Sequence, residues 1–90
     1  MTTPIHRPGA HRFEATVDGH AGHLEYEVHE GALTIVHTEV GPALEGRGVA
    51  GALVQAALDH ARANGLEVRA RCAYAASYIA RHPEAMSPRA

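Results

Sequence analysis

Apolar and polar side chains alternate along the first forty residues with the period of half-buried β-strands. Residues 13–17 alternate in this way, and residues 24–29 do so again after a turn over residues 19–22. Glu30-Gly31 predicts a second tight turn before a third strand at residues 32–40. The third strand is apolar or small on both faces, with Leu33 and Ile35 on one and Val36 and Val40 on the other. The pattern predicts an antiparallel meander whose third strand lies centrally in the sheet.

The period changes at about Arg47, where a helix is expected to begin. One apolar stripe then recurs at helical spacing, at Ala50, Leu53, Val54, Ala57, Leu58 and Ala61. Asn64-Gly65 predicts the end of this helix, residues 66–72 a strand parallel to the third, and residues 73–81 a last helix. The predicted fold is an α+β mixed sheet in the order β-β-β-α-β-α, an antiparallel meander followed by a parallel pair. Residues 1–90 form one domain, and its ends at residues 1–10 and 85–90 are expected to be flexible.

The composition of the chain limits the kinds of molecule that it is expected to bind. The chain has 90 residues, a net charge of -2 and no apolar run near the roughly 20 residues of a membrane span, so neither nucleic acid nor a membrane is expected to bind. One cysteine excludes an internal disulfide and fits a reducing cytoplasm, where we expect a monomer or homodimer. Although there are eight histidines, His20-x-x-His23 lacks further ligands at metal-site spacing, and no metal is expected.

The stretch from Val40 to Gly51 joins the third strand to the long helix. Pro42 ends the strand, and the glycines that follow leave backbone N–H groups bare where the helix begins. Such a helix start binds anions, so a phosphate or pyrophosphate ligand is expected. A nucleotide P-loop is excluded because no Lys-Ser or Lys-Thr follows a glycine. Residues 46–51 match the dinucleotide pattern G-x-G-x-x-G, but hairpins precede them and the chain is too short for a doubly wound sheet.

Two motifs together resemble the GNAT superfamily of acetyl-CoA-dependent N-acetyltransferases. Glu45-Gly46-Arg47-Gly48-Val49-Ala50 is similar to its phosphate loop [RQ]-x-x-G-x-[GA], with Glu45 departing at the Arg/Gln position. Cys72-Ala73-Tyr74-Ala75-Ala76-Ser77-Tyr78 has the spacing of its N-x-x-A-x-x-Y motif, with Cys72 in place of Asn. With Leu44–Ala50 and His82-Pro83-Glu84, these residues resemble a compact single-domain branch of predicted acetyltransferases.

The resemblance implies a GNAT-like sheet whose parallel strand pair is splayed around acetyl-CoA, and transfer of an acetyl group from acetyl-CoA to an amine of an unknown small molecule or protein. The alternative is a non-catalytic acyl-CoA-binding or interaction domain. Arg47 is expected near the pyrophosphate and Arg69 and Arg71 near the 3′-phosphate, with a position on the solvated surface as the alternative for each. The coenzyme-binding residues implied are Val40, Leu44, Glu45, Gly46, Arg47, Gly48, Val49, Ala50, Gly51, Cys72 and Tyr78.

Four residues are candidates for catalysis. His37 and Glu39 lie two apart on one face of the third strand, and either can accept a proton, although a structural histidine and a solvated carboxylate are equally consistent. The resemblance places Tyr78 near the CoA sulfur as a proton donor, and Tyr74 in the core or the pocket wall. Cys72 either carries an acetyl group, activated by His37 and the following helix N-terminus, or only packs against the coenzyme.

Overall fold

Two tight turns of the same kind fold the first part of the chain into an antiparallel sheet. In the computed structural model, which describes residues 3–83, φ is 52° and 77° at Asp18-Gly19 and 50° and 80° at Glu30-Gly31. Two consecutive positive φ angles are typical of the type I′ turn, whose twist matches that of the strands it joins. The strands are β1 (Ile5–Arg7), β2 (Arg12–Val17), β3 (His20–His29) and β4 (Ala32–Val40).

The predicted meander is confirmed, with two corrections. The first turn is confined to Asp18-Gly19, so β3 begins at His20 and includes Gly22, which the sequence analysis had assigned to the turn. The flexible lead-in expected over residues 1–10 contains β1, which pairs with β2, and a 3-10 turn at Pro8–Ala10. A three-residue strand is too short to show alternation, which is why the pattern missed it. The tail expected to be flexible, residues 85–90, lies outside the described residues.

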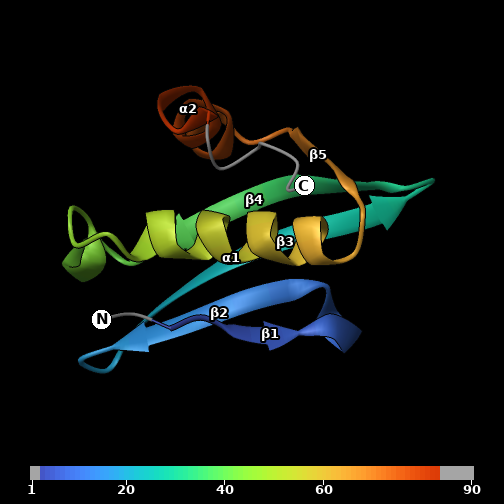
Figure 1. Cartoon of the computed structure of the whole chain (residues 1–90). Coiled ribbons are helices and arrows are strands. Elements are labelled where there is room, and N and C mark those ends of the chain that lie inside the picture. Colours follow the sequence, from blue (N-terminus) through green and yellow to red (C-terminus); the bar gives the residue numbers. More distant parts are fainter. Residues whose placement is uncertain (1–2, 84–90) are drawn as a thin grey trace.

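The second part of the chain adds two helices and a parallel strand. A 3-10 turn (Pro42–Leu44) leads to α1 (Val49–Ala63), which is followed by β5 (Glu67–Ala70) and α2 (Ala73–Arg81). Within residues 3–83 the sheet order is β1-β2-β3-β4-β5, and only the β4–β5 pair is parallel, as predicted. This part of the chain therefore has one strand, β1, more than the expected β-β-β-α-β-α. Figure 1 shows α1 lying across one face of the sheet and α2 beside its β5 edge.

The core lies between α1 and the sheet face that it covers. The predicted stripe of α1 supplies Leu53, Val54, Ala57, Leu58 and Ala61, all at most 2% exposed, although Val49 rather than Ala50 completes it. The sheet contributes Phe13, Leu24, Leu33 and Ile35. Burial of each large apolar side chain stabilises the fold by about 1.5–3 kcal/mol. This packing fixes the start of α1 relative to the end of β4.

A β-bulge in β4 changes which side chains face the core. Glu25 pairs with His37 while its neighbour Tyr26 pairs with Ile35, so Val36 has no partner in β3. The expectation that Val40 faces away from Leu33 and Ile35 is therefore wrong. Val40 packs against the core, and its side chain covers Gly22, where an added Cβ would lie 2.7 Å from Val40 Cγ1. The extra residue shifts the alternation by one position.

The pairing between the two parallel strands, β4 and β5, ends halfway along β4. Their pairing joins residues 32–35 to residues 67–70, and β4 continues to Val40 without a β5 partner. The backbone edge of β4 on that side is consequently open along residues 36–40. This open edge points toward the loop that begins α1, and α2 starts beside it.

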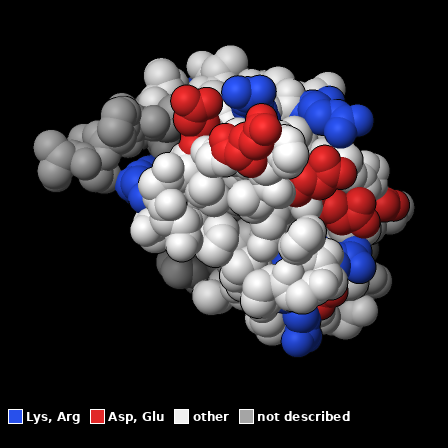
Figure 2. Space-filling model, turned by 90° about the vertical axis from the view of Figure 1, so that its right-hand side faces the viewer, with Lys and Arg blue, Asp and Glu red and all other residues white. Residues whose placement is uncertain are grey.

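Charges of opposite sign are mixed on the surface. Figure 2 shows acidic and basic side chains next to one another along the upper and right-hand parts of the view, beside a larger uncharged area. On the sheet face opposite α1, ion pairs join Arg12 to Glu25 (3.8 Å) and Arg71 to Glu27 (4.0 Å). Within residues 3–83, neither helix combines the length and the apolarity needed to cross a lipid bilayer.

Candidate active site

The loop before α1 leads to backbone N–H groups that have no partner among the described residues. Gly46 and Gly48 have φ of 76° and 81°, a conformation that favours glycine, and Gly48 is the N-cap of α1. Ala52 donates the first hydrogen bond of the helix, to the carbonyl of Gly48 (3.0 Å). The N–H groups of residues 49–51 precede it and therefore have no acceptor within the helix. The helix start with bare N–H groups, on which the prediction of an anion site depends, is thus present, and anion binding there stays a prediction.

A cleft of about 550 Å³ opens between this loop, the open end of β4 and α2. Most of the predicted coenzyme-binding residues line it, namely Val40, Leu44, Glu45, Gly46, Gly48, Val49, Ala50 and Gly51. Glu39 and Thr38 line it from β4, and Tyr74 and Arg81 from α2. Arg47, Cys72 and Tyr78 are not among the lining residues. The cleft thus brings together nearly all of the loop residues, whereas Arg47, Cys72 and Tyr78 lie next to lining residues without lining the cleft themselves.

Arg69 and Arg71 lie on the solvated surface, one of the two positions expected for them, whereas Arg47 has a partner that was not predicted. Arg47 forms an ion pair with Asp18 in the β2–β3 turn (2.9 Å), so its side chain ties the loop to that hairpin. Arg69 approaches Glu67 (3.6 Å), and Arg71, as noted above, reaches an acidic side chain of β3 on the sheet face opposite α1. The arginine that lines the cleft is Arg81, which the sequence analysis missed. Its spacing of seven residues from Tyr74 places both on one helix face and is the signal that identifies it.

Two tyrosines of α2 pack close to the start of α1. A Cβ added to Gly51 would lie 3.3 Å from Cε2 of Tyr78 and 3.5 Å from the hydroxyl of Tyr74, so glycine allows the close approach of the two helices. The hydroxyl of Tyr78 donates a hydrogen bond to Gln55 of α1 (2.8 Å). Tyr74, which is 37% exposed, lines the cleft, as expected for a residue of the pocket wall. Of the two tyrosines, Tyr74 is therefore the one that lines the cleft.

Cys72 is the N-cap of α2 and lies against the open part of β4. Its Sγ accepts a hydrogen bond from the N–H of Ala75 (3.3 Å) and lies 3.5 Å from Oγ1 of Thr38. Adjacent residues of a strand point to opposite faces, so His37 faces away from Cys72. The expectation that His37 approaches the thiol is wrong, because the bulge turns Thr38 toward it instead.

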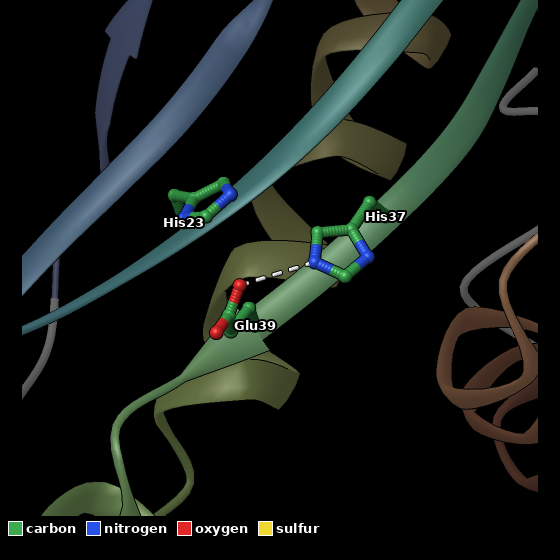
Figure 3. Close-up of side chains that lie close together, drawn as sticks. All are labelled: His23, His37 and Glu39. Carbon is green, nitrogen blue, oxygen red and sulfur yellow. Dashed lines mark hydrogen bonds and ion pairs between the residues drawn. The ribbon is translucent and has the colours of Figure 1, made fainter.

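His37 and Glu39 form a pair on the sheet face opposite α1. Nε2 of His37 lies 3.2 Å from Oε1 of Glu39, within hydrogen-bonding distance, and both side chains are exposed (Figure 3). The prediction that they share a face is confirmed. The sequence analysis did not foresee His23, which pairs across the strands with Glu39 and places its ring 5.7 Å from that of His37. Only the register of β3 on β4 reveals this neighbour.

The sequence as a whole was then compared with known proteins. A sequence profile that describes GCN5-related N-acetyl-transferases matches residues 12–87. No curated protein matches the chain. The matched segment runs from β2 past the end of α2 and so includes the glycine loop and every residue of the cleft. It supports acetyltransferase activity in general, and the chain belongs to the family of GCN5-related N-acetyltransferases.

Proposed function

We propose that this protein transfers an acetyl group from acetyl-CoA to an amine, with the coenzyme in the cleft at the start of α1. The observation that carries the proposal is that the N–H groups of residues 49–51 and the open edge of β4 border the same cleft. A helix N-terminus attracts anions through its dipole and its bare N–H groups. The volume of about 550 Å³ lies within the usual range for a small-molecule site.

The charges of the cleft make the backbone the main phosphate ligand in this proposal. Glu39 and Glu45 line the cleft together with one arginine, Arg81. Carboxylates repel phosphates, so the side chains give little net attraction. Arg81 is placed to contact a phosphate, whereas Arg47 contributes by holding the loop through its pair with Asp18. Backbone N–H groups then supply the remaining hydrogen bonds to the diphosphate.

The acetyl thioester is proposed to lie along the open edge of β4, beside Thr38. The acceptor amine approaches from a second cleft of about 420 Å³ on the other side, which Glu14, His23 and Glu39 line. Because Glu39 lines both clefts, it is the group best placed to take a proton from an arriving ammonium. His37, at 3.2 Å from its carboxylate, positions Glu39.

Direct transfer requires one attack and three proton movements. Glu39 accepts a proton from the ammonium, and the amine nitrogen then attacks the thioester carbonyl to form the C–N bond. As the C–S bond breaks, the departing CoA thiolate takes a proton from a tyrosine of α2, and the second proton of the amine nitrogen replaces the one that the tyrosine has given up. Tyr78 holds the motif position, but its hydroxyl is engaged with Gln55, whereas Tyr74 lines the cleft and is the donor that the geometry favours.

A covalent route through Cys72 is the alternative within the same site. Its thiolate attacks the thioester, the acetyl group moves to Sγ and CoA leaves, after which the amine takes the acetyl group from sulfur. The chain contains no lysine, since its eight basic residues are all arginines. Acetyl label retained by the protein therefore reports on Cys72 without a background from lysine side chains.

Labelled acetyl-CoA tests the proposal and both routes. The protein is incubated with acetyl-CoA carrying a labelled acetyl group, with and without a panel of amines, and free CoA and intact protein mass are measured. We expect amine-dependent release of CoA and labelled product. Label on the wild-type chain that Cys72→Ala lacks, with loss of turnover, assigns the covalent route, and an undiminished rate in Cys72→Ala assigns direct transfer. CoA binding without release by any amine would mean a non-catalytic acyl-CoA-binding domain.

A further inference from the structure

Three metal-ligating side chains gather on the sheet face opposite α1, and one of their residues, Glu39, also lines the coenzyme cleft (Figure 3). His23 of β3 pairs directly with Glu39 of β4, and His37 lies two residues before Glu39 on the same face. One ligand atom from each residue lies within 4.8 Å of the other two. Two neighbouring strands of a rigid sheet therefore hold two imidazoles and a carboxylate around one point.

We propose that His23, His37 and Glu39 bind a divalent transition-metal ion, with Zn²⁺ as the reference case. Two imidazoles and one carboxylate are a donor set that Zn²⁺ accepts, with further positions left for water or a ligand. Tetrahedral bonds of about 2.1 Å need ligand atoms about 3.4 Å apart. The His37–Glu39 separation of 3.2 Å meets this requirement as it stands.

The other two separations, from the ligand atom of His23 to those of His37 and Glu39, can shorten by rotation of the side chains alone. The side chains of His37 and Glu39 are 52% and 65% exposed, so no packing opposes a change of rotamer. His23 is more fixed, with its side chain 23% exposed. The site thus has one positioned ligand on β3 and two adjustable ligands on β4.

One nitrogen of the His23 ring lacks a hydrogen-bond partner among the described residues, and binding of a metal would remove this deficit. Its Nε2 is buried and has no hydrogen-bond partner among the described residues, although Oε2 of Glu25 is 3.3 Å away. A buried polar atom without a partner is destabilising. If Nε2 binds the metal, it gains a ligand bond. If the other ring nitrogen binds, the proton stays on Nε2 and faces the Glu25 carboxylate, as the second nitrogen of a metal-bound histidine commonly does.

Metal binding here would compete with the acetyl transfer proposed above. His37 and Glu39 cannot hold a metal and serve the acceptor amine at the same time, and His23 and Glu39 also line the second cleft. Zn²⁺ is therefore expected to inhibit transfer. This consequence rests on the proposed function, whereas the binding itself does not.

Calorimetric titration of the full chain with Zn²⁺, at about pH 8 where imidazoles bind metals in their neutral form, tests the site. We expect saturable binding of one ion per chain in the wild type. His37→Gln and Glu39→Gln, both at exposed positions, are expected to weaken binding by at least about tenfold. His29→Gln is the matched control, because His29 also sits beside a carboxylate, that of Glu30 (3.7 Å), but belongs to no three-ligand group among the described residues.

Cys72→Ala controls for binding by the thiol and should retain the wild-type affinity. The proposal is overturned if Zn²⁺ does not saturate, if His37→Gln and Glu39→Gln bind as tightly as His29→Gln, or if Cys72→Ala abolishes binding. The two proposals fail separately in this design. Zn²⁺ binding without acetyl transfer refutes only the proposed function, and acetyl transfer without a Zn²⁺ site refutes only the metal site.

Discussion

Replacing Gly48 by alanine separates the binding role of the loop from its conformational role. Gly48 has φ of 81° and Gly31, in the β3–β4 turn, has φ of 80°, and a Cβ added at either meets nothing within 4 Å. Each alanine therefore adopts the left-handed conformation without a clash, at a cost of about 1–2 kcal/mol. The less flexible unfolded chain offsets about 0.4–1 kcal/mol of this. We expect both variants to lose about 1 kcal/mol of unfolding free energy, or roughly 4–8 °C in Tm.

Only Gly48→Ala is expected to weaken CoA binding, because Gly48 lines the cleft and Gly31 does not. A methyl group at this position lies where the phosphates must approach the N–H groups of α1. Loss of one hydrogen bond to a charged group costs about 1.5–3 kcal/mol, which corresponds to about 10- to 100-fold weaker binding. Urea unfolding measures the stability of both variants, and calorimetric titration with CoA measures affinity. Equal CoA affinity of Gly48→Ala and Gly31→Ala would refute the reasoning.

Three further predictions follow from single side chains. Glu45→Gln removes an exposed carboxylate from the cleft and should tighten CoA binding by up to about fivefold, since exposed charge interactions are worth about 0.2–1 kcal/mol. Weaker CoA binding of this variant in a calorimetric titration would contradict this prediction. Tyr74→Phe should lower kcat by about 100-fold or more if the phenol of Tyr74 is the proton donor, whereas Tyr78→Phe should mainly reduce stability. A larger loss of kcat in Tyr78→Phe than in Tyr74→Phe, measured by steady-state kinetics, would assign the donor to Tyr78. Burial, and then the nearby His60, lowers the pKa of His6 below its ordinary 6.5, so the unfolded chain takes up this proton first on acidification. The free energy of unfolding should fall as the pH drops below about 6.5 and level off under the folded-state pKa of His6. The fall should be smaller in His60→Gln, which lacks the neighbouring imidazole. An identical pH profile in that variant would argue against a contribution of His60 to the lowered pKa of His6.

Local patterns predicted the elements well because each depends on nearby residues. The stripe from Leu53 to Ala61 specifies the buried face of α1, and the pair Glu30-Gly31 specifies a turn. The glycine loop was found for the same reason, since positive φ angles such as those at Gly46 and Gly48 favour glycine. These features require no knowledge of the rest of the fold.

The side chains that complete the site depend on tertiary structure and were harder to predict. The bulge opposite Glu25-Tyr26 reverses the alternation of β4, so Thr38 rather than His37 meets Cys72. No residue type in β4 predicts the bulge, because the register of β4 on β3 determines where the bulge lies. Arg81 similarly reaches the cleft only because α2 packs against the start of α1.

A nuclear magnetic resonance titration of the ¹⁵N-labelled protein with CoA tests the central claim most directly, because it observes the backbone N–H groups themselves. The account predicts saturable shifts concentrated at the amides of Gly46, Gly48 and residues 49–51, with that of Gly31 in the distant β3–β4 turn unchanged. Saturable shifts centred elsewhere in the sheet, or no shifts at all, would contradict the coenzyme site at the start of α1.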